Sequence, residues 1–163
     1  MKKELMTLVP MIRRFAYSLT GSPHDADDLL QNTIERVLSR GVPENVELTK
    51  WVFRVCRNIW IDDYRARKVR HNAAQSEDLT ADQFVDGEKI IYNQITLGEV
   101  NVAMEKLPED QRSILSLIAV QGMSYKEVAE TLSIPIGTVM SRLARARVAL
   151  CGYLNIVEAE TNI

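Results

Sequence analysis

An all-α fold, with two small helical domains joined by an acidic linker, is what the sequence predicts. Apolar residues recur at helical spacing in one segment after another, and glycine or proline follows most of these segments. Charge is also unevenly distributed. Residues 1–70 hold 13 basic and 9 acidic side chains, residues 71–93 hold 1 and 5, and residues 94–163 hold 6 and 8. We therefore expect a first domain at 1–70, a linker at 71–93 and a second domain at 94–163.

Length and composition restrict the class of protein. The chain has 163 residues, 46% of them hydrophobic, which is enough to build cores and argues against global disorder. No apolar run approaches the roughly 20 residues that span a bilayer, and the N-terminus lacks the apolar core of a signal peptide. Cys56 and Cys151 have no metal ligand at the usual spacings and are interpreted as buried thiols, with a redox sensor or a bridge as the alternative. We expect a cytoplasmic protein without membrane insertion.

Two amphipathic helices are expected to open the first domain. Residues 4–20 carry an apolar stripe, and Pro10 predicts either a kink in this helix or a later start near the proline. Residues 24–41 place apolar side chains at i, i+3, i+4, i+7 and i+8, with acids in the first turn and Gly41 as the stop. The polar face of this second helix is either solvated or a docking surface for a basic partner, and the residues alone favour the solvated face.

A third helix is expected over residues 50–70. It carries seven basic residues against two acids, and aromatic rings alternate with the cations along one stripe. Single-stranded nucleic acid needs this combination, because unstacked bases pack on rings while phosphates pair with cations. We assign Trp51 and Phe53 to the core, whereas base contact and packing are both open for Trp60 and Tyr64. The other residues predicted to face the core are Val52, Val55, Cys56, Ile59 and Ala66.

The second domain is expected to end in a helix-turn-helix over residues 124–150. Ser124 is the predicted N-cap of its first helix, and Glu127 stands where it can close a capping box. Residues 133–137 contain the proline and the glycine that are expected to form the turn. The second helix is expected to start near Thr138. Two further helices are predicted before this motif, over residues 95–107 and 108–122.

The last predicted helix has the composition of a helix that reads a DNA groove. From Thr138 to Tyr153 it carries three arginines and no acid, beside an apolar stripe that would hold it on the domain. Short polar groups and arginine near the start of such a helix suit base edges, and arginine further along suits phosphates. An ordinary helical hairpin with a solvated basic face is the plainer alternative.

Three stretches of the chain resemble bacterial sigma factors of the extracytoplasmic-function (ECF) group of the sigma-70 family. PIGTVMSRLARAR, from Pro135, resembles the recognition helix of that family. WVFRVCRNIWIDDYRARKVR, from Trp51, resembles its promoter-melting and −10 segment. DADDLLQNTIERVL, from Asp25, resembles the helix that docks on the clamp coiled coil of the largest RNA polymerase subunit. The resemblance covers about residues 1–153 in the family's order, and it implies a non-enzymatic factor that binds RNA polymerase core and directs promoter-specific initiation.

The resemblance also implies roles for single residues, position by position. Contacts to the −35 element are implied for Thr138, Ser141, Arg142, Arg145 and Arg147. Contacts to the −10 element are implied for Lys50, Arg54, Arg57, Asn58, Trp60, Tyr64, Arg65, Arg67, Lys68 and Arg70. Docking on the polymerase core is implied for Asp28, Gln31, Asn32 and Glu35. The chain departs from the usual family pattern at Asn32, Met140 and Ala144.

The resemblance implies partners as well: RNA polymerase core, promoter DNA and an inhibitory anti-sigma factor. For the acidic linker three interpretations are open. It is a flexible tether, a segment that threads a basic channel of the polymerase, or a segment that docks on the basic first domain and holds the free protein closed.

Two rival functions are compatible with a helix-turn-helix alone. A transcriptional activator of the response-regulator type would need a receiver domain upstream, and residues 1–70 show no alternating strands for one. A helical adaptor that binds only protein is the second rival. An enzyme is not expected, because the sequence has no metal-ligand cluster, no nucleophile beside a base and no glycine-rich phosphate loop. No catalytic residue, cofactor or metal is therefore predicted.

Overall fold

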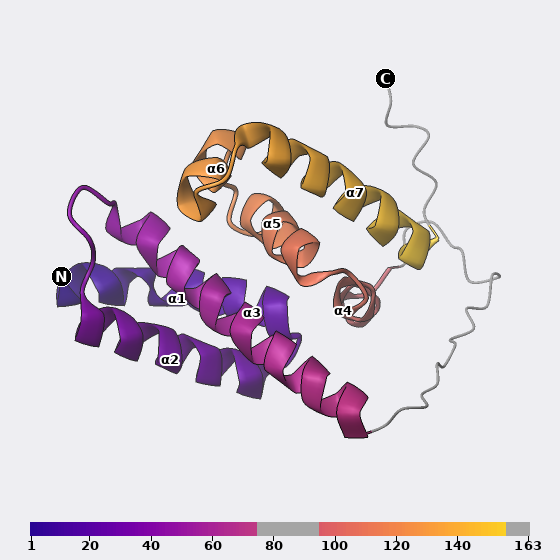
Figure 1. Cartoon of the computed structure of the whole chain (residues 1–163), viewed down its shortest axis with the longest axis horizontal. Coiled ribbons are helices and arrows are strands. Elements are labelled where there is room, and N and C mark those ends of the chain that lie inside the picture. The colour runs from indigo at the N-terminus through magenta and orange to yellow at the C-terminus, as the bar shows by residue number, and fades with distance from the viewer. Residues whose placement is uncertain (75–94, 156–163) are drawn as a thin grey trace.

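The helices fall into two groups, one from each part of the chain, which pack against each other (Figure 1). The structure is a computed structural model and describes residues 1–74 and 95–155. Within these ranges it contains seven α-helices and no strands, which confirms the all-α prediction. The helices are α1 (Lys2–Thr20), α2 (Pro23–Arg40), α3 (Leu48–Ala74), α4 (Leu97–Glu105), α5 (Glu109–Ala119), α6 (Tyr125–Leu132) and α7 (Ile136–Leu154).

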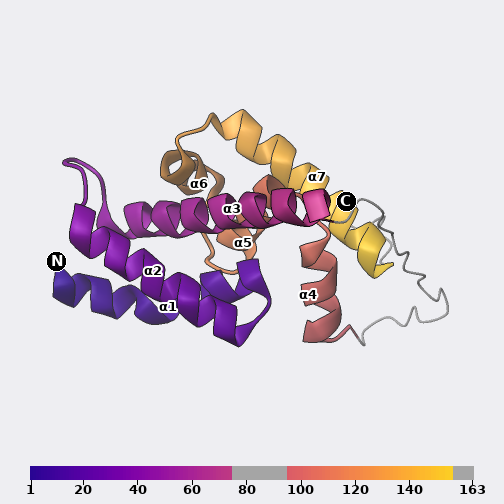
Figure 2. The same cartoon turned by 60° about the horizontal axis from the view of Figure 1, so that its bottom comes forward.

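In the first group, α1 and α2 pair and the long α3 packs on both of them (Figure 2). The rings of Phe15 on α1 and Phe53 on α3 meet edge to face, with centroids 5.3 Å apart and an interplanar angle of 80°. Pro10 lies inside α1, so a start near the proline is wrong. Leu5 and Ile12, on either side of Pro10, are both buried. Burial on both sides therefore holds the helix together where the proline removes one backbone donor.

The bounds of α2 and α3 differ from the predicted ones by a few residues. Ser22 is the N-cap of α2, and its hydroxyl accepts a bond from the backbone N–H of Asp25 at 3.3 Å. The third helix, α3, continues four residues past the predicted end of the first domain. Ala66 was expected in the core and is exposed, like all of residues 65–73. The remainder of the predicted linker, from residue 75 on, lies outside the described residues.

The second group ends in the predicted helix-turn-helix, formed by α6 and α7. Ser124 and Glu127 form the predicted capping box: the backbone N–H of Ser124 donates to Oε1 of Glu127 at 2.8 Å, and the N–H of Glu127 donates to Oγ of Ser124 at 3.1 Å. The turn differs in detail, because Ser133 takes the left-handed conformation, with φ 57°. Pro135 is the N-cap of α7, and Gly137 already belongs to that helix. The prediction that Gly137 forms part of the turn is therefore wrong.

We expect Ser124→Ala to lower the free energy of unfolding by about 0.5–2 kcal/mol, because the N–H of Glu127 loses its acceptor at the start of α6. Urea denaturation followed by circular dichroism measures this difference. Ser39→Ala is the matched control, since Ser39 is exposed near the end of α2 and its replacement should change stability by no more than about 0.5 kcal/mol. Equal effects of the two substitutions would contradict the role of the cap.

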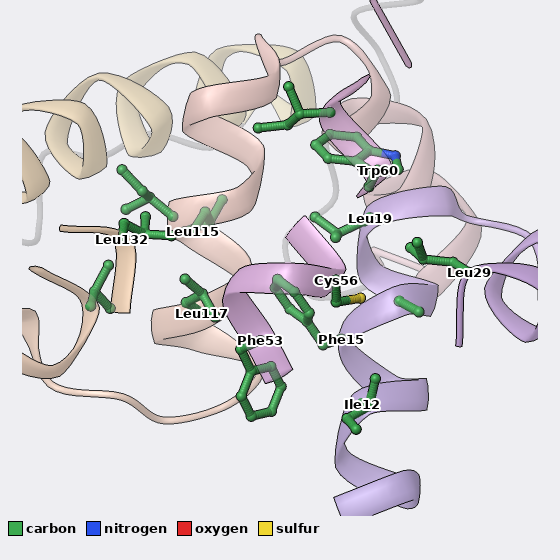
Figure 3. Close-up of a cluster of buried hydrophobic side chains, with 14 of the residues drawn as sticks. Ile12, Phe15, Leu19, Leu29, Phe53, Cys56, Trp60, Leu115, Leu117 and Leu132 are labelled. Carbon is green, nitrogen blue, oxygen red and sulfur yellow. The ribbon is translucent and has the colours of Figure 1, made fainter. Parts of the chain in front are cut away.

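The buried side chains of the two groups form one continuous cluster (Figure 3). In this cluster α3 packs against α5 and α6, while α1 packs against α4 and α5. Cys56 is fully buried there, which raises the pKa of its thiol to about 12, while a hydrogen bond with Thr33 opposes the shift. The buried-thiol interpretation is therefore confirmed for Cys56, whereas Cys151 on α7 is only half-buried. Of the helices that the structure describes, none combines the length and the apolar content needed to cross a bilayer.

Candidate nucleic-acid interface

Four cations of α3 lie along one face of the helix and point at the second helical group. They follow a spacing of four, three and eight residues, which keeps them on one side of a helix. Nη1 of Arg54 donates to Oγ of Ser133 at 2.8 Å, and Nε of Arg65 donates to Oε2 of Glu109 at 3.0 Å. Lys50 forms an ion pair with Glu130 of α6. The face of α3 that carries these four cations is therefore covered by polar groups of α5, of α6 and of the turn between α6 and α7.

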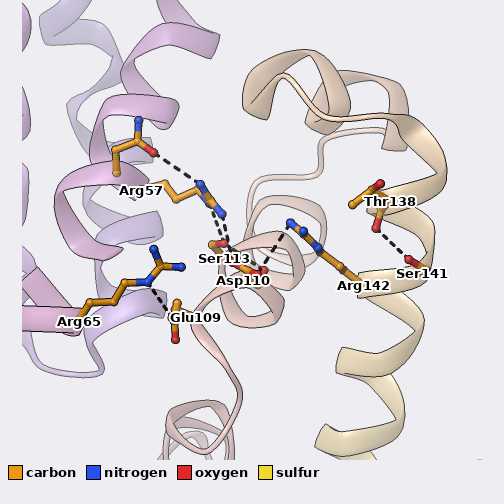
Figure 4. Close-up of polar contacts among 9 residues, drawn as sticks. Arg57, Arg65, Glu109, Asp110, Ser113, Thr138, Ser141 and Arg142 are labelled. Atoms are coloured by element: carbon orange, nitrogen blue, oxygen red, sulfur yellow. Dashed lines mark hydrogen bonds and ion pairs between the residues drawn. The ribbon is translucent and has the colours of Figure 1, made fainter. Parts of the chain in front are cut away.

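Arg57 stands at the centre of this contact (Figure 4). Its Nε donates to Oγ of Ser113 at 2.9 Å, and its Nη2 lies 3.5 Å from Oδ1 of Asp110. Burial lowers the pKa of the Arg57 guanidinium, and the charge of Asp110 opposes this shift. The side chain of Arg65 is more exposed, and its hydrogen bond with Glu109 raises its pKa. The ion pair of Arg65 is thus close to solvent, whereas Arg57 is paired in a largely buried site.

The two aromatic candidates whose role was open, Trp60 and Tyr64, differ in burial. Trp60 is 5% exposed and packs in the core, with the guanidinium of Arg112 over its ring at 5.7 Å. Tyr64 is half-buried beside it, with ring centroids 5.5 Å apart, and Lys68 lies over the Tyr64 ring at 6.0 Å. In this conformation Trp60 presents no face to a base. A base contact through Trp60 would require α3 to separate from α5.

The other residues proposed for the −10 element are exposed. Asn58 lies on the surface beside Arg57, whose Nη1 is 3.5 Å from its side-chain oxygen. Nη2 of Arg67 pairs with Oδ2 of Asp63, one turn earlier, at 2.6 Å. Lys68 and Arg70 are exposed near the end of α3. The candidates of α3 therefore lie in two environments. Some are covered by the second helical group, and the others are exposed to solvent.

On α7 an apolar stripe fixes the helix and leaves the polar candidates outside. The side chains that anchor α7 are Val139, Leu143 and Ala146, all buried. Ser141, Arg145 and Arg147 are exposed, and Thr138 is half-buried. Nη1 of Arg142 lies 3.9 Å from Oδ2 of Asp110, the carboxylate that also contacts Arg57 (Figure 4). Asp110 therefore lies between one candidate of the −10 set and one of the −35 set.

The candidates for polymerase docking share the outer face of α2. The opposite side of the helix is buried through Ala26, Leu29, Thr33 and Val37, so among the described residues this outer face points to solvent. Asp28 lies near the start of α2, with its Oδ2 3.6 Å from Nε2 of His24. The docking candidates Asp28, Gln31, Asn32 and Glu35 are all exposed.

Sequence reasoning missed the residues of the second group that contact the first group. Glu109 and Asp110 were explained by the dipole at the start of α5, and that explanation is complete without any partner. No role was predicted for Arg112, yet it is 3% exposed and its Nε donates to the backbone oxygen of Ser18 at 3.2 Å. The one signal that could have indicated its role is a cation two positions before Ile114, where the apolar run of α5 begins.

Comparison with known proteins identifies the family. The model of sigma-70 region 2 matches residues 5–70, and the model of sigma-70 region 4 matches residues 97–150. The ECF RNA polymerase sigma factor EcfG of Rhodopseudomonas palustris is 32% identical over 98% of this chain and 88% of that protein. This chain belongs to the ECF sigma factors. As a sigma factor it works with RNA polymerase in transcription initiation.

Other ECF sigma factors are also similar to this chain over most of its length. The ECF sigma factor SigE of Mycolicibacterium smegmatis is 33% identical over 92% of this chain and 60% of that protein. Among solved structures, RpoE of Bartonella quintana in complex with the anti-sigma factor NepR aligns with a TM-score of 0.73 and 28% identity, over 95% of this sigma factor and 96% of that chain. CnrH in complex with the cytosolic domain of CnrY has the same fold, with a TM-score of 0.65 and 22% identity over 99% and 92% of the two chains.

Proposed function

We propose that this ECF sigma factor recognises two promoter elements with two separate helical surfaces. Residues 1–70 form a domain that docks on the polymerase core through α2 and binds the −10 element through α3. Residues 94–163 form a domain that reads the −35 element through α7. The observation that carries the proposal is the arrangement of cations, which lie on one face of α3 and, separately, on the outer side of α7.

The two surfaces suit different forms of DNA. On α7, exposed Ser141 and Arg145 stand beside half-buried Arg142 on a helix whose opposite face is buried, and this is how a recognition helix enters the major groove of a duplex. On α3, Asn58 and Tyr64 lie among arginines, which suits an opened strand. Capture of unstacked bases, worth roughly 1–3 kcal/mol for each base that stacks, would favour melting of the −10 region.

The chemistry of transcription belongs to the polymerase in this proposal. The sigma factor itself is not an enzyme; it positions the core on the promoter in the cytoplasm. The RpoE structure contains the anti-sigma factor NepR. By likeness to RpoE, we propose that an anti-sigma factor also regulates this chain.

The direct test is transcription in vitro with purified core polymerase on fragments of a genomic library. The expected result is a set of transcripts whose start sites share sequences at the −35 and −10 positions. If the purified protein bound DNA alone with a palindromic footprint, an activator would be favoured instead. If no fragment gave a specific transcript, the chain would be an adaptor that binds only protein.

We expect Asp28→Arg to weaken retention on core polymerase by about 1–3 kcal/mol, because a charge at a docking surface is reversed. Asp28 is exposed on α2, so the domain should stay folded. A pull-down with immobilised core polymerase measures retention, and a thermal melt checks folding. Glu44→Arg is the matched control, since Glu44 is an exposed acid in the loop between α2 and α3. Equal retention of both variants would remove the outer face of α2 from the docking surface.

A further inference from the structure

A strip of apolar side chains runs along the outer side of α7, beside the polar residues proposed for the −35 element. Met140, Ala144 and Val148 follow one another at a spacing of four, which places them along one edge of the helix. All three are exposed, Met140 to 50% and Val148 to 63%. Single exposed apolar residues are ordinary on a protein surface. An exposed strip of them beside charged groups is more typical of a binding surface.

The strip takes no part in holding α7 on the second helical group. The buried residues Val139, Leu143 and Ala146 do this from the inner side of the helix, where α7 packs on α5 (Figure 1). At about 100° per residue, Met140 and Ala144 lie roughly 100–140° away from Val139 around the helix axis. The strip therefore has no role in the core that the structure describes.

Gly137 lies on the same edge, one turn before Met140. It is not among the glycines with a positive φ, and a Cβ added to it would meet nothing within 4 Å beyond its chain neighbours and its own helix. Glycine is less favourable than alanine in a helix. Neither the backbone conformation nor packing within the described part of the chain therefore requires a glycine here. A glycine does allow another molecule to approach the backbone closely.

The charges beside the strip favour duplex DNA as the partner. Ser141 and Arg145 border the strip on one side, and Arg147 borders it on the other. The helix α7 contains no acid. Phosphates line both margins of the major groove, and the 5-methyl group of thymine is the apolar group that the bases present inside it. An apolar strip between cations matches this arrangement of methyl groups between phosphates.

We propose that Met140 and Ala144 recognise thymine in the −35 element by contact with its 5-methyl group. The inference rests on the proposed reading of the −35 element by α7, and it adds an apolar contact to the hydrogen bonds expected of that helix. Met140 is unbranched and adaptable, so its side chain can follow the position of a methyl group. The short side chain of Ala144 keeps the next turn of α7 close to the bases.

The expected size of the effect follows from the loss of one methyl group. Deoxyuridine pairs as thymidine does and keeps the O4 acceptor, but it lacks the 5-methyl group. Removing one methyl group from an apolar contact should weaken binding about fourfold. The effect should appear only at the position, or the two neighbouring positions, that Met140 and Ala144 contact.

The test is transcription in vitro with the full chain bound to core polymerase, at limiting concentration, on a promoter recovered from the genomic library. Each thymidine of its −35 element, on either strand, is replaced in turn by deoxyuridine. We expect one or two replacements to lower the transcript about fourfold. Met140→Ala should lower the transcript from the thymidine template by a similar factor, and it should abolish the difference between thymidine and deoxyuridine at one of these positions.

Met6→Ala is the matched control, because Met6 is an exposed methionine on α1, with 62% of its surface accessible. This variant should keep the transcript level of the original chain and its fourfold preference for thymidine. Alanine favours a helix at both positions, so neither variant should unfold. A thermal melt followed by circular dichroism checks this.

A template with a scrambled −35 element separates the inference from the function on which it rests. If scrambling lowered the transcript but no deoxyuridine did, the methyl contact would be overturned and the reading of the −35 element would stand. The same holds if the element contained no thymine, or if Met140→Ala kept the full preference for thymidine. A loss in Met140→Ala that was equal on the scrambled template would place Met140 against a protein surface instead. If scrambling had no effect, the proposed role of α7 would fail, and the methyl contact with it.

Discussion

Phe53→Ala should lower the free energy of unfolding by about 3–5 kcal/mol, because it leaves a ring-sized cavity where α3 meets α1. Phe53 is 1% exposed and its ring meets that of Phe15 edge to face. A loss of this size is a large share of the roughly 5–15 kcal/mol that stabilises a typical domain. Since α3 carries the proposed strand-binding cations, the variant should also lose promoter-specific transcription.

Urea denaturation followed by circular dichroism measures the loss of stability. Val69→Ala is the control on the same helix, because Val69 is 68% exposed and its truncation should cost no more than about 0.5 kcal/mol. Phe53→Leu should fall between the two, since it keeps part of the buried volume. If Phe53→Ala and Val69→Ala were equally stable, α3 would not be held on α1 by this ring.

Local patterns predicted most of the helices, because a helix that buries one face records that face in its sequence. In α2 the buried residues Ala26, Leu29, Thr33 and Val37 recur at helical spacing, so the prediction needed no tertiary information. The capping box of Ser124 and Glu127 is similarly local, because both partners lie within one turn. The family resemblance then supplied the order of the functional segments.

The contact between the two groups could not be predicted in the same way. Arg57 and Asp110 are separated by more than fifty residues, and a cation with that much intervening chain can pair with any acid that the fold brings near it. Trp60 shows the difficulty clearly. Its position on α3 suits both a base contact and a core contact, and only the packing of Arg112 against it decides between them.

The turn of the helix-turn-helix shows a smaller limit. Proline and glycine marked the turn, but the residue that takes the left-handed conformation is Ser133. A residue other than glycine adopts this conformation at a modest cost in free energy. Local preference therefore does not single out Ser133, and we attribute its conformation to the way α6 packs on α7.

The last prediction concerns the −35 surface. Arg142→Ala should weaken initiation at promoters that depend on a −35 element by about 1–3 kcal/mol, if its guanidinium binds a base edge in the major groove. Arg142 is half-buried on α7, and its contact with Asp110 at 3.9 Å is long and partly exposed, so its loss should change stability little. Alanine also favours the helix, which keeps α7 intact.

Transcription in vitro on templates with single base changes in the −35 element separates base contact from phosphate contact. Loss of Arg142 should reduce the discrimination between templates at one position. Arg147→Ala is the comparison, because Arg147 is exposed further along α7, where we expect an arginine to contact a phosphate. It should weaken binding about equally on all templates and lower the slope of the salt dependence by about one. If Arg142→Ala weakened every template equally, Arg142 would bind a phosphate, and the base readout would have to come from Thr138 and Ser141, the polar residues nearest the start of α7.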